Sequence, residues 1–488
     1  MVEPSKWNIG LMNDNSSKYL TAETFGFKLN SDGVSLRKKQ TWSLEQVDGE
    51  AIYLKSHLGR YLTADPKGNL CCEAEERESN AKFTVEIKDG KWALKSVHGA
   101  YFGANGDQLK CVAKIGKTEL WTVHLAMHPQ INLKSVLRKR YAHLDEEDND
   151  VKVSELIPWG ADATITLKFS GGRYFLVTSN GKYVSASGDL QDEPNDDCSF
   201  SVEFHQTSIA FRDHKGKYLT AVGTGKLQSK KETAGKDELF QLEDSHPQVS
   251  FIGHTNKRVS IKQHTDLRAN QMDMGDTEIF QLEFNEDGKT VSLLGNNGMY
   301  WVANGPVSAT EKTITPKAQF TMEYHNNQVA FKAHTGMYLT SNKQGQLLDG
   351  TPELEEAGKF SMEIVNRPLL ILKGEFGFIG CKTSTNRLEC NRAAYDVFTL
   401  EVEEAESEEE RGTWYKIGSE KGKYWRVEGD GSISVSGEAN SADLFEIFLE
   451  RRNYLCIKAK NGAYLRGQQN GVFNANGKSI AKDSLWEY

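Results

Sequence analysis

Gly59-Arg60-Tyr61-Leu62 joins a turn to an aromatic residue, and versions of this segment recur about every 40 residues along the 488-residue chain. A second marker of the form aromatic-x-aliphatic-acidic, as in Trp42-Ser43-Leu44-Glu45, keeps the same period. The first marker, here called the turn aromatic, or its nearest equivalent falls at Tyr19, Tyr61, Tyr101, Tyr141, Tyr183, Tyr218, Arg258, Tyr300, Tyr338, Phe378, Tyr424 and Tyr464. The second, here called the closing strand, begins at Trp42, Phe83, Trp121, Ile165, Phe200, Phe240, Phe280, Phe320, Phe360, Phe398, Phe445 and Trp486. Two independent markers with one period indicate an array of twelve structural cassettes.

The local pattern of the cassettes is that of β-structure. Phe200-Ser-Val-Glu-Phe204 and Phe280-Gln-Leu-Glu-Phe284 alternate apolar and polar residues, as half-buried strands do. Gly-containing pairs such as Asn180-Gly181 and Asp287-Gly288 lie between the strands at hairpin positions. One short segment, Ala234 to Leu239, has the pattern of a single helical turn. The chain is therefore predicted to be all-β.

A longer period groups the cassettes in threes. His128-Pro129-Gln130 returns as His246-Pro247-Gln248 and, more loosely, as Asn366-Arg367-Pro368, at intervals of about 120 residues. A β-propeller also has blades of about 40–45 residues, but equal blades would not show this grouping. The sequence therefore predicts four tandem β-trefoil domains of three cassettes each. Their predicted boundaries are 7–127, 128–247, 248–368 and 369–488.

Composition narrows the class of protein. The first 25 residues lack the apolar segment of a signal peptide, and no apolar run approaches the length of a membrane span. Seven scattered cysteines favour reduced thiols in the cytosol over a disulfide framework. The net charge of −9 argues against general nucleic-acid binding. We expect a cytoplasmic protein without membrane insertion, metal or cofactor.

Long segments of the chain resemble the fascin family, whose members consist of four β-trefoils and bundle actin. The segments that carry the resemblance are 18–27, 56–62, 126–130, 138–144, 235–240, 374–381 and 484–488. The resemblance implies a monomer that cross-links actin filaments into parallel bundles, located in the actin cytoskeleton and in filopodia-like cell protrusions. It implies no enzymatic activity, and no Gly-x-Ser-x-Gly or His-Glu-x-x-His motif points to catalysis. A cross-linker that acts as a monomer needs at least two filament-binding surfaces.

The segment Ser35-Leu-Arg-Lys-Lys39 is the most testable candidate site. Its cations Arg37, Lys38 and Lys39 suit an acidic filament surface, and we expect the segment to lie on an exposed turn. The family resemblance places a phosphorylation by a protein kinase C-type kinase at Ser35. A phosphate there adds about −1.5 to −2 charges beside the cations and would weaken their attraction. The alternative interpretation is a solvated basic turn with an ordinary serine.

The resemblance identifies further candidate residues for filament binding. Lys18 matches a family lysine associated with filament binding. Lys343, Lys373, Glu375 and Lys382 match positions that affect bundling. The alternative for each of them taken singly is simple solubility. Phe376 stands where the family pattern has a histidine, which removes any role of that imidazole from this chain.

Other features receive structural interpretations. Arg138-Lys139-Arg140 is either a second binding patch or a partner of the neighbouring acidic residues 145–148. The acidic run 401–410 is expected to be a solvated hairpin loop that points away from a filament. The turn aromatics are expected to pack in the cores because they recur with the cassettes, whereas Arg258 breaks the pattern and suggests an inter-domain contact.

The main alternative function is a carbohydrate-binding array, since the β-trefoil hosts many lectins. The Gln-x-Trp signature of ricin-type trefoils appears as Gln40-Thr41-Trp42 and does not recur with the cassettes. The cysteine pattern also argues against a secreted lectin. Filamentous actin is therefore the expected partner.

Overall fold

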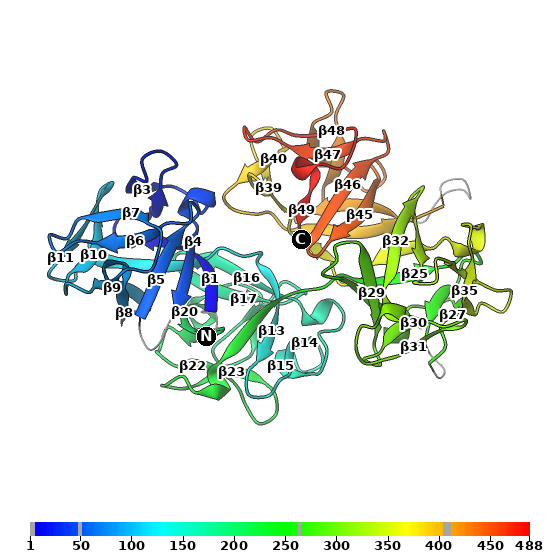
Figure 1. The fold of residues 1–488 in the computed structure, drawn as a ribbon, viewed down its shortest axis with the longest axis horizontal. Coiled ribbons are helices and arrows are strands. Elements are labelled where there is room, and N and C mark those ends of the chain that lie inside the picture. Colours follow the sequence, from blue (N-terminus) through cyan, green and yellow to red (C-terminus); the bar gives the residue numbers. More distant parts are fainter. Residues whose placement is uncertain (1–4, 47–50, 262–264, 404–410) are drawn as a thin grey trace. The chain divides into compact units, whose positions relative to one another are not determined.

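The computed structural model describes residues 5–46, 51–261, 265–403 and 411–488. In these ranges the chain forms β-strands and short 3-10 helices and no α-helix (Figure 1). The predicted single turn near 234–239 is the 3-10 helix η6 (Lys236–Glu238). No helix of the described residues is long and apolar enough to cross a membrane.

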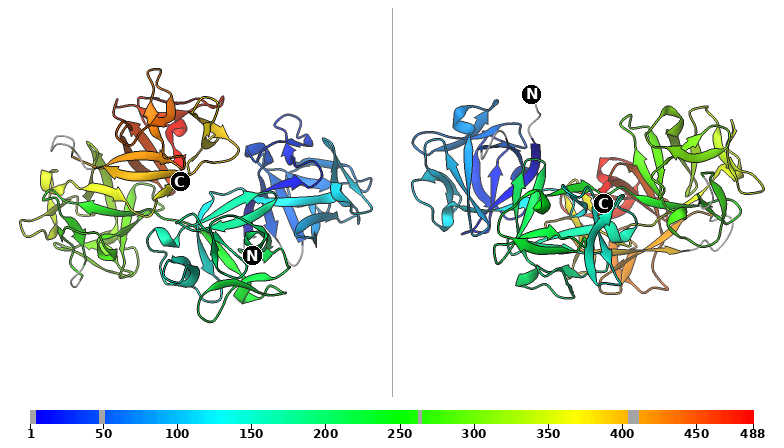
Figure 2. Two further views of the ribbon diagram at one scale, coloured as in Figure 1. Left: turned by 180° about the vertical axis from the view of Figure 1, so that it is seen from behind. Right: turned by 90° about the horizontal axis from the view of Figure 1, so that it is seen from below.

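The first domain is a closed barrel of six strands. In cyclic order β1, β4, β5, β8, β9 and β12 pair with one another, and β12 pairs back with β1. Three hairpins, β2–β3, β6–β7 and β10–β11, extend from the barrel, one for each cassette. This combination of a six-stranded barrel with three hairpins is the β-trefoil. Figure 2 shows the strands of this domain, in blue, wrapped into a barrel.

The strands of the first trefoil are β1 (Ser5–Asn13), β2 (Tyr19–Ala22), β3 (Leu29–Gly33), β4 (Trp42–Gln46), β5 (Ala51–Ser56), β6 (Tyr61–Ala64), β7 (Leu70–Ala74), β8 (Phe83–Lys88), β9 (Lys91–Ser96), β10 (Tyr101–Asn105), β11 (Gln108–Val112) and β12 (Leu120–Leu125). Those of the second are β13 (Gln130–Ser135), β14 (Tyr141–Asp145), β15 (Asp150–Glu155), β16 (Ile165–Ser170), β17 (Arg173–Val177), β18 (Tyr183–Val184), β19 (Leu190–Gln191), β20 (Phe200–His205), β21 (Ser208–Asp213), β22 (Tyr218–Ala221), β23 (Leu227–Lys231) and β24 (Phe240–Asp244).

The third trefoil contains β25 (Gln248–Ile252), β26 (Arg258–Ser260), β27 (Arg268–Gln271), β28 (Phe280–Phe284), β29 (Thr290–Gly295), β30 (Tyr300–Ala303), β31 (Val307–Glu311), β32 (Phe320–His325), β33 (Gln328–Lys332), β34 (Tyr338–Ser341), β35 (Leu347–Thr351) and β36 (Ser361–Ile364). The fourth contains β37 (Leu369–Leu370), β38 (Lys373–Gly374), β39 (Gly377–Lys382), β40 (Arg387–Arg392), β41 (Phe398–Glu403), β42 (Trp414–Ser419), β43 (Tyr424–Val427), β44 (Ile433–Gly437), β45 (Phe445–Arg451), β46 (Tyr454–Ala459), β47 (Tyr464–Gly467), β48 (Phe473–Gly477) and β49 (Trp486–Glu487). Its first barrel strand is divided into β37 and β38, which pair with β41 and β49 respectively.

The two sequence markers coincide with strand starts. Each turn aromatic or its equivalent is the first residue of a hairpin strand, except Phe378, which is the second residue of β39. Each closing strand begins at its marker, except that Trp121 is the second residue of β12 and Phe360 directly precedes β36. The all-β prediction and the four β-trefoils are confirmed.

The trefoils are organised in two compact units. Unit 1 comprises residues 1–154 and 165–243, and unit 2 comprises residues 155–164 and 244–488. One cluster of buried apolar side chains runs through the first and second trefoils, and another runs through the third and fourth. The segment 155–164 belongs to unit 2 because the Gln248 side chain accepts from the Gly160 amide and donates to the Pro158 carbonyl.

A buried tyrosine joins the two trefoils of each unit in the same way. In unit 1 the Tyr174 hydroxyl accepts a hydrogen bond from Leu125 N at 2.6 Å and donates to Val123 O at 3.3 Å. In unit 2 the Tyr415 hydroxyl accepts from Ile364 N at 3.0 Å and donates to Met362 O at 3.3 Å. Burial raises the pKa of both phenols well above the usual value. Each hydroxyl satisfies buried backbone groups at the end of the preceding barrel.

Candidate functional site

The first candidate surface is built on the hairpin β2–β3 of the first trefoil. Strand Tyr19-Leu20-Thr21-Ala22 is fully buried, and Trp42 Nε1 donates to Leu20 O at 3.2 Å. After β3 the chain returns through the 3-10 helix η1 (Lys38–Gln40), whose Gln40 Nε2 donates to Thr21 Oγ1 at 3.0 Å. This contact holds the basic turn alongside the hairpin.

Cations dominate the outer side of this turn. Lys18, Arg37, Lys38 and Lys39 are exposed. Lys39 Nζ lies 2.7 Å from Glu23 Oε2, and the hydrogen bond from Lys39 lowers the pKa of the Glu23 carboxyl. In the described part of the chain, no ion pair involves Lys18 or Lys38. These two ammonium groups are thus available to an acidic partner. We call the surface formed by Lys18, Arg37, Lys38 and Lys39 the first basic surface.

Ser35 departs from the expectation of an exposed turn. Its cations are exposed as expected, but Ser35 itself is only 7% exposed, and its Oγ accepts a hydrogen bond from Arg37 Nε at 3.2 Å. The burial of Ser35 follows from the packing of the next residue, Leu36, against β1. The Leu36 side chain occupies the space beside Gly10, where an added Cβ would stand 2.5 Å from Leu36 Cδ1. The glycine in β1 therefore leaves room for Leu36, which draws the turn onto the barrel. Burial of this serine depends on that tertiary contact.

The second group of candidates lies in unit 2. Lys343 is exposed in the loop between β34 and β35 of the third trefoil. In the fourth trefoil, Lys373 Nζ lies 3.4 Å from Glu487 Oε2, and Lys382 Nζ lies 3.2 Å from Glu389 Oε1. Glu375 forms an ion pair with Lys482. These last three candidates are therefore already paired within their own domain.

Within each unit the structure brings some of the candidates together. Ser35 and the first basic surface share one hairpin region of unit 1. Lys373, Glu375 and Lys382 share the strands β38 and β39 and the loop between them in unit 2, while Lys343 stands on another trefoil of that unit. Phe376, at the tip of the β38–β39 hairpin, is partly buried.

Arg138 does not pair with the acidic run that follows it. Its Nε donates to Ala221 O at 3.3 Å and its guanidinium also donates to Val222 O, so it joins two cassettes of the second trefoil. Asp145 and Asp148 instead pair with Lys152. The acidic run 401–410 lies mostly outside the described residues, because only its first three residues belong to β41.

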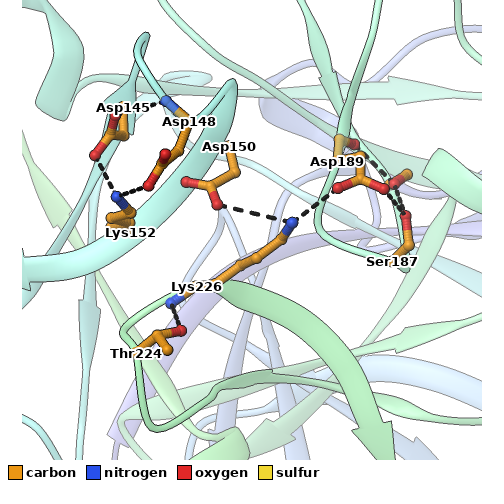
Figure 3. A network of polar contacts seen from close by, with 9 residues as sticks. Asp145, Asp148, Asp150, Lys152, Ser187, Asp189, Thr224 and Lys226 are labelled. Atoms are coloured by element: carbon orange, nitrogen blue, oxygen red, sulfur yellow. Dashed lines mark hydrogen bonds and ion pairs between the residues drawn. The ribbon is translucent and has the colours of Figure 1, made fainter.

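The carboxylates of the second trefoil form a mixed network at the hairpin end of the barrel (Figure 3). Lys152 bridges Asp145 and Asp148, while Lys226 lies 2.7 Å from Asp189 and 3.7 Å from Asp150. The strands meet there through the bridges Asp150–Asp189 and Lys152–Lys226. Desolvation raises the pKa of the Asp150 carboxyl, whereas the hydrogen bond from Lys226 lowers that of Asp189. The network closes the three hairpins on one another, which is a structural role.

The turn aromatics form a recurring hydrogen bond with the closing strands, which neither sequence marker shows when it is considered alone. The hydroxyl of a turn tyrosine donates to the acidic residue of a closing strand, as in Tyr61–Glu45 at 3.1 Å and Tyr218–Glu203 at 2.8 Å. Arg258 takes the same place, because its Nη1 lies 2.7 Å from Glu363 Oε2 within the third trefoil. The expectation of an inter-domain contact for Arg258 is therefore wrong. The signal was present, since the tyrosine and the acidic residue recur together in both markers.

A surface hollow of the first unit is lined by polar, charged and aromatic residues of two trefoils. It has a volume of about 550 Å³, and its lining includes the ion pair of Lys91 with Asp14, together with Phe169 and Arg173. Among the described residues, no group of three or more His, Cys, Asp and Glu side chains is placed to hold a metal ion. The seven cysteines are all free thiols.

Comparison with known proteins finds similarity along nearly the whole chain. A family model described as the fascin domain matches residues 16–123, 131–242, 254–362 and 375–488, one stretch for each barrel. A fascin-2 from Bos taurus is 39% identical over 493 residues, which cover 99% of this chain and 98% of the relative. A fascin from Strongylocentrotus purpuratus is 38% identical over 506 residues, covering 99% of both chains. A fascin-3 from Mus musculus is 24% identical over 481 residues, covering 96% of this chain and 95% of the relative.

Proposed function

The chain belongs to the fascin family of structural, actin-bundling proteins, and from this we propose that it binds actin filaments and cross-links them into parallel bundles without catalysis. The observation that carries the proposal is the family match, which extends over all four barrels. We place the protein at the actin cytoskeleton and in cell protrusions, and we propose the domain boundaries 7–127, 128–247, 248–368 and 369–488.

Cross-linking by a single chain requires two separate binding surfaces. We assign one to the first basic surface of unit 1 and the other to Lys343, Lys373, Glu375 and Lys382 of unit 2. Support comes from the presence of exposed cations in both units, on a chain whose net charge is −9. Because an acidic filament must meet local basic patches against this overall charge, binding should weaken as salt screens the contacts. The proposed active form is a monomer.

We propose that phosphorylation of Ser35 by a protein kinase C-type kinase weakens the first basic surface. Since the Ser35 side chain is 7% exposed, the turn must open locally before a kinase can reach its hydroxyl. The added phosphate cannot return to the buried position, because an unpaired charge is costly to bury. It would instead lie among Arg37, Lys38 and Lys39 and neutralise part of their charge.

The direct test mixes purified protein with filamentous actin and centrifuges the mixture at low force, which pellets bundles but leaves single filaments in solution. The proposal predicts that actin moves to the pellet at physiological salt and that electron microscopy shows parallel bundles. Folded protein that leaves actin in the supernatant under these conditions would refute it. Size-exclusion chromatography with light scattering tests the monomeric state.

A further inference from the structure

We propose that Phe25 and Val34 are the apolar anchors with which the first basic surface binds a filament. The inference rests on the proposed function and adds the residues that supply contact area as well as charge. Phe25 is 88% exposed and Val34 is 82% exposed, and they are the most exposed large hydrophobic side chains among the described residues. Single exposed apolar groups are common on proteins, so exposure alone does not carry the assignment.

The backbone that presents Phe25 provides an independent observation. Gly26 has a φ of 67° and Phe27 has a φ of 49°, so two consecutive residues of the β2–β3 loop adopt the left-handed conformation. The other non-glycine residues of the described chain with positive φ are Asn, Asp, Ser, Gln or Lys. A bulky aromatic residue in this region is a genuine outlier and marks a strained loop. Strain of this kind concentrates at binding sites.

A neighbouring cassette holds the loop in this conformation. The guanidinium of Arg60 lies 5.3 Å from the centre of the Phe27 ring, a cation–π contact. Arg60 is fixed in turn by an ion pair with Glu75. Phe27 is therefore partly buried against Arg60, while Phe25, two residues earlier in the same loop, is exposed to solvent. An aromatic side chain presented by a fixed loop loses little conformational freedom on binding.

The apolar side chains and the cations lie along the same hairpin. Tyr19 pairs with Gly33, so Lys18 and Val34 lie at the same end. At the other end Glu23 N donates to Lys28 O at 2.8 Å, next to the loop that carries Phe25. The ion pair of Lys39 with Glu23 lies at this second end, since Glu23 directly follows β2. The partner this surface fits is acidic and offers apolar depressions at both ends of the contact, and we assign that partner as the actin filament.

The surface combines a large apolar contact area, supplied by Phe25, with an arginine and lysines. Contacts that dominate binding energy are commonly large side chains that become desolvated on binding, with other polar and charged groups around them that exclude water. The charges in turn steer the encounter and make its rate depend on salt. Loss of the aromatic residue should therefore reduce affinity without changing the salt dependence, and loss of the cations should reduce both.

High-speed co-sedimentation with filamentous actin, at two salt concentrations, separates these contributions. We expect Phe25→Ser to weaken binding about tenfold and Val34→Ser to weaken it less, with the salt dependence of the wild type retained. The matched control is Met272→Ser, at a side chain that is 70% exposed in the third trefoil, which should stay within about twofold of wild type. Thermal unfolding checks that all variants are folded.

This experiment distinguishes a failure of the present inference from a failure of the proposed actin-binding function. If the wild type bundles actin and Phe25→Ser binds like the wild type, the inference is wrong and the proposed function stands. Equal losses in Phe25→Ser and Met272→Ser would also overturn it, because the effect would not be specific to this surface. A wild type that does not bind filaments at all overturns both. If sedimentation velocity shows a wild-type dimer that Phe25→Ser dissociates, the surface belongs to a second copy of the chain.

Discussion

Two hairpins of the first trefoil share a core strand and the elements that follow it, but their loops carry different side chains. Tyr-Leu-Thr-Ala occupies residues 19–22 in the first cassette and residues 61–64 in the second, and all four side chains are buried in both. Both hairpins are followed by a 3-10 helix, η1 (Lys38–Gln40) and η2 (Ser79–Ala81), and then by a closing strand. The fold thus repeats nearly unchanged.

The outer surfaces of these hairpins carry opposite charge. Residues 23–40 contain four basic and two acidic side chains, a net charge of +2, whereas residues 65–81 contain two basic and five acidic side chains, a net charge of −3. The position of Ser35, seven residues before the closing strand, is taken by the exposed Glu76 in the second cassette. The shared strand is required by the barrel, and the difference between the loops can carry a function that belongs to one cassette.

The largest expected effect concerns what the hairpins share. Leu20 and Leu62 are both fully buried, so Leu20→Ala and Leu62→Ala should each lower the free energy of unfolding by about 2–5 kcal/mol. The two losses should be similar because the strands are identical. Chemical denaturation measures both values. A large loss in one variant alone would show that the two strands are not equivalent in the core.

A smaller effect, on filament binding, is expected when a negative charge is introduced into the first hairpin alone. Ser35→Glu should weaken filament binding about tenfold, because the new carboxylate lies beside Arg37, Lys38 and Lys39. The protein should still fold, since Glu76 occupies the equivalent position of the second cassette. Co-sedimentation measures the affinity, with Glu76→Ser as the matched control, which should bind as the wild type does. Unchanged binding by Ser35→Glu would reject the proposed switch.

The smallest effect concerns the ion pair of Lys39 with Glu23. The pair is largely exposed, so Lys39→Ala should cost less than about 1 kcal/mol of stability. Lys39 lowers the pKa of Glu23, so the stabilisation is present above the ordinary carboxyl pKa and is lost as the pH falls through the lowered value. NMR titration of Lys39→Ala should show the pKa of Glu23 moving up. In the second hairpin the pKa of Asp65, lowered by Asn69, should not move.

The repeat made the fold predictable because the same large side chains must fill each barrel. Trp42 and Phe83 mark equivalent closing strands, and the structure starts a strand at each of them. The tyrosine–carboxylate contact was not predicted, although both members were visible, because the pairing of Tyr61 with Glu45 arises only when two strands meet in the barrel. Tyr174 and Tyr415 are about 240 residues apart, so only an alignment of one unit on the other would have linked them.

The sequence predicted which residues of the first basic surface are charged and exposed, but it did not predict that Ser35 is buried. The exposure of Lys38 follows from its type, whereas the burial of Ser35 depends on Leu36 packing over Gly10 in another strand. The exposure of Phe25 was not predicted, because its sequence context does not distinguish it from aromatic residues that pack inside the barrels, and only the folded structure shows it exposed. Local pattern determines what recurs, and tertiary contacts determine which side chains are presented.

The most direct test exchanges charge between the two hairpins and measures filament binding at equilibrium by high-speed co-sedimentation. One variant carries Lys18→Glu and Lys38→Glu on the first hairpin, and the other carries Glu76→Lys and Glu78→Lys on the second. Binding by the first variant should be at least about tenfold weaker than wild type, with a smaller dependence on salt, because two attractive contacts become repulsive. The second variant should bind at least as tightly as the wild type. Equal affinities of both variants and the wild type would contradict the assignment of filament binding to the first basic surface.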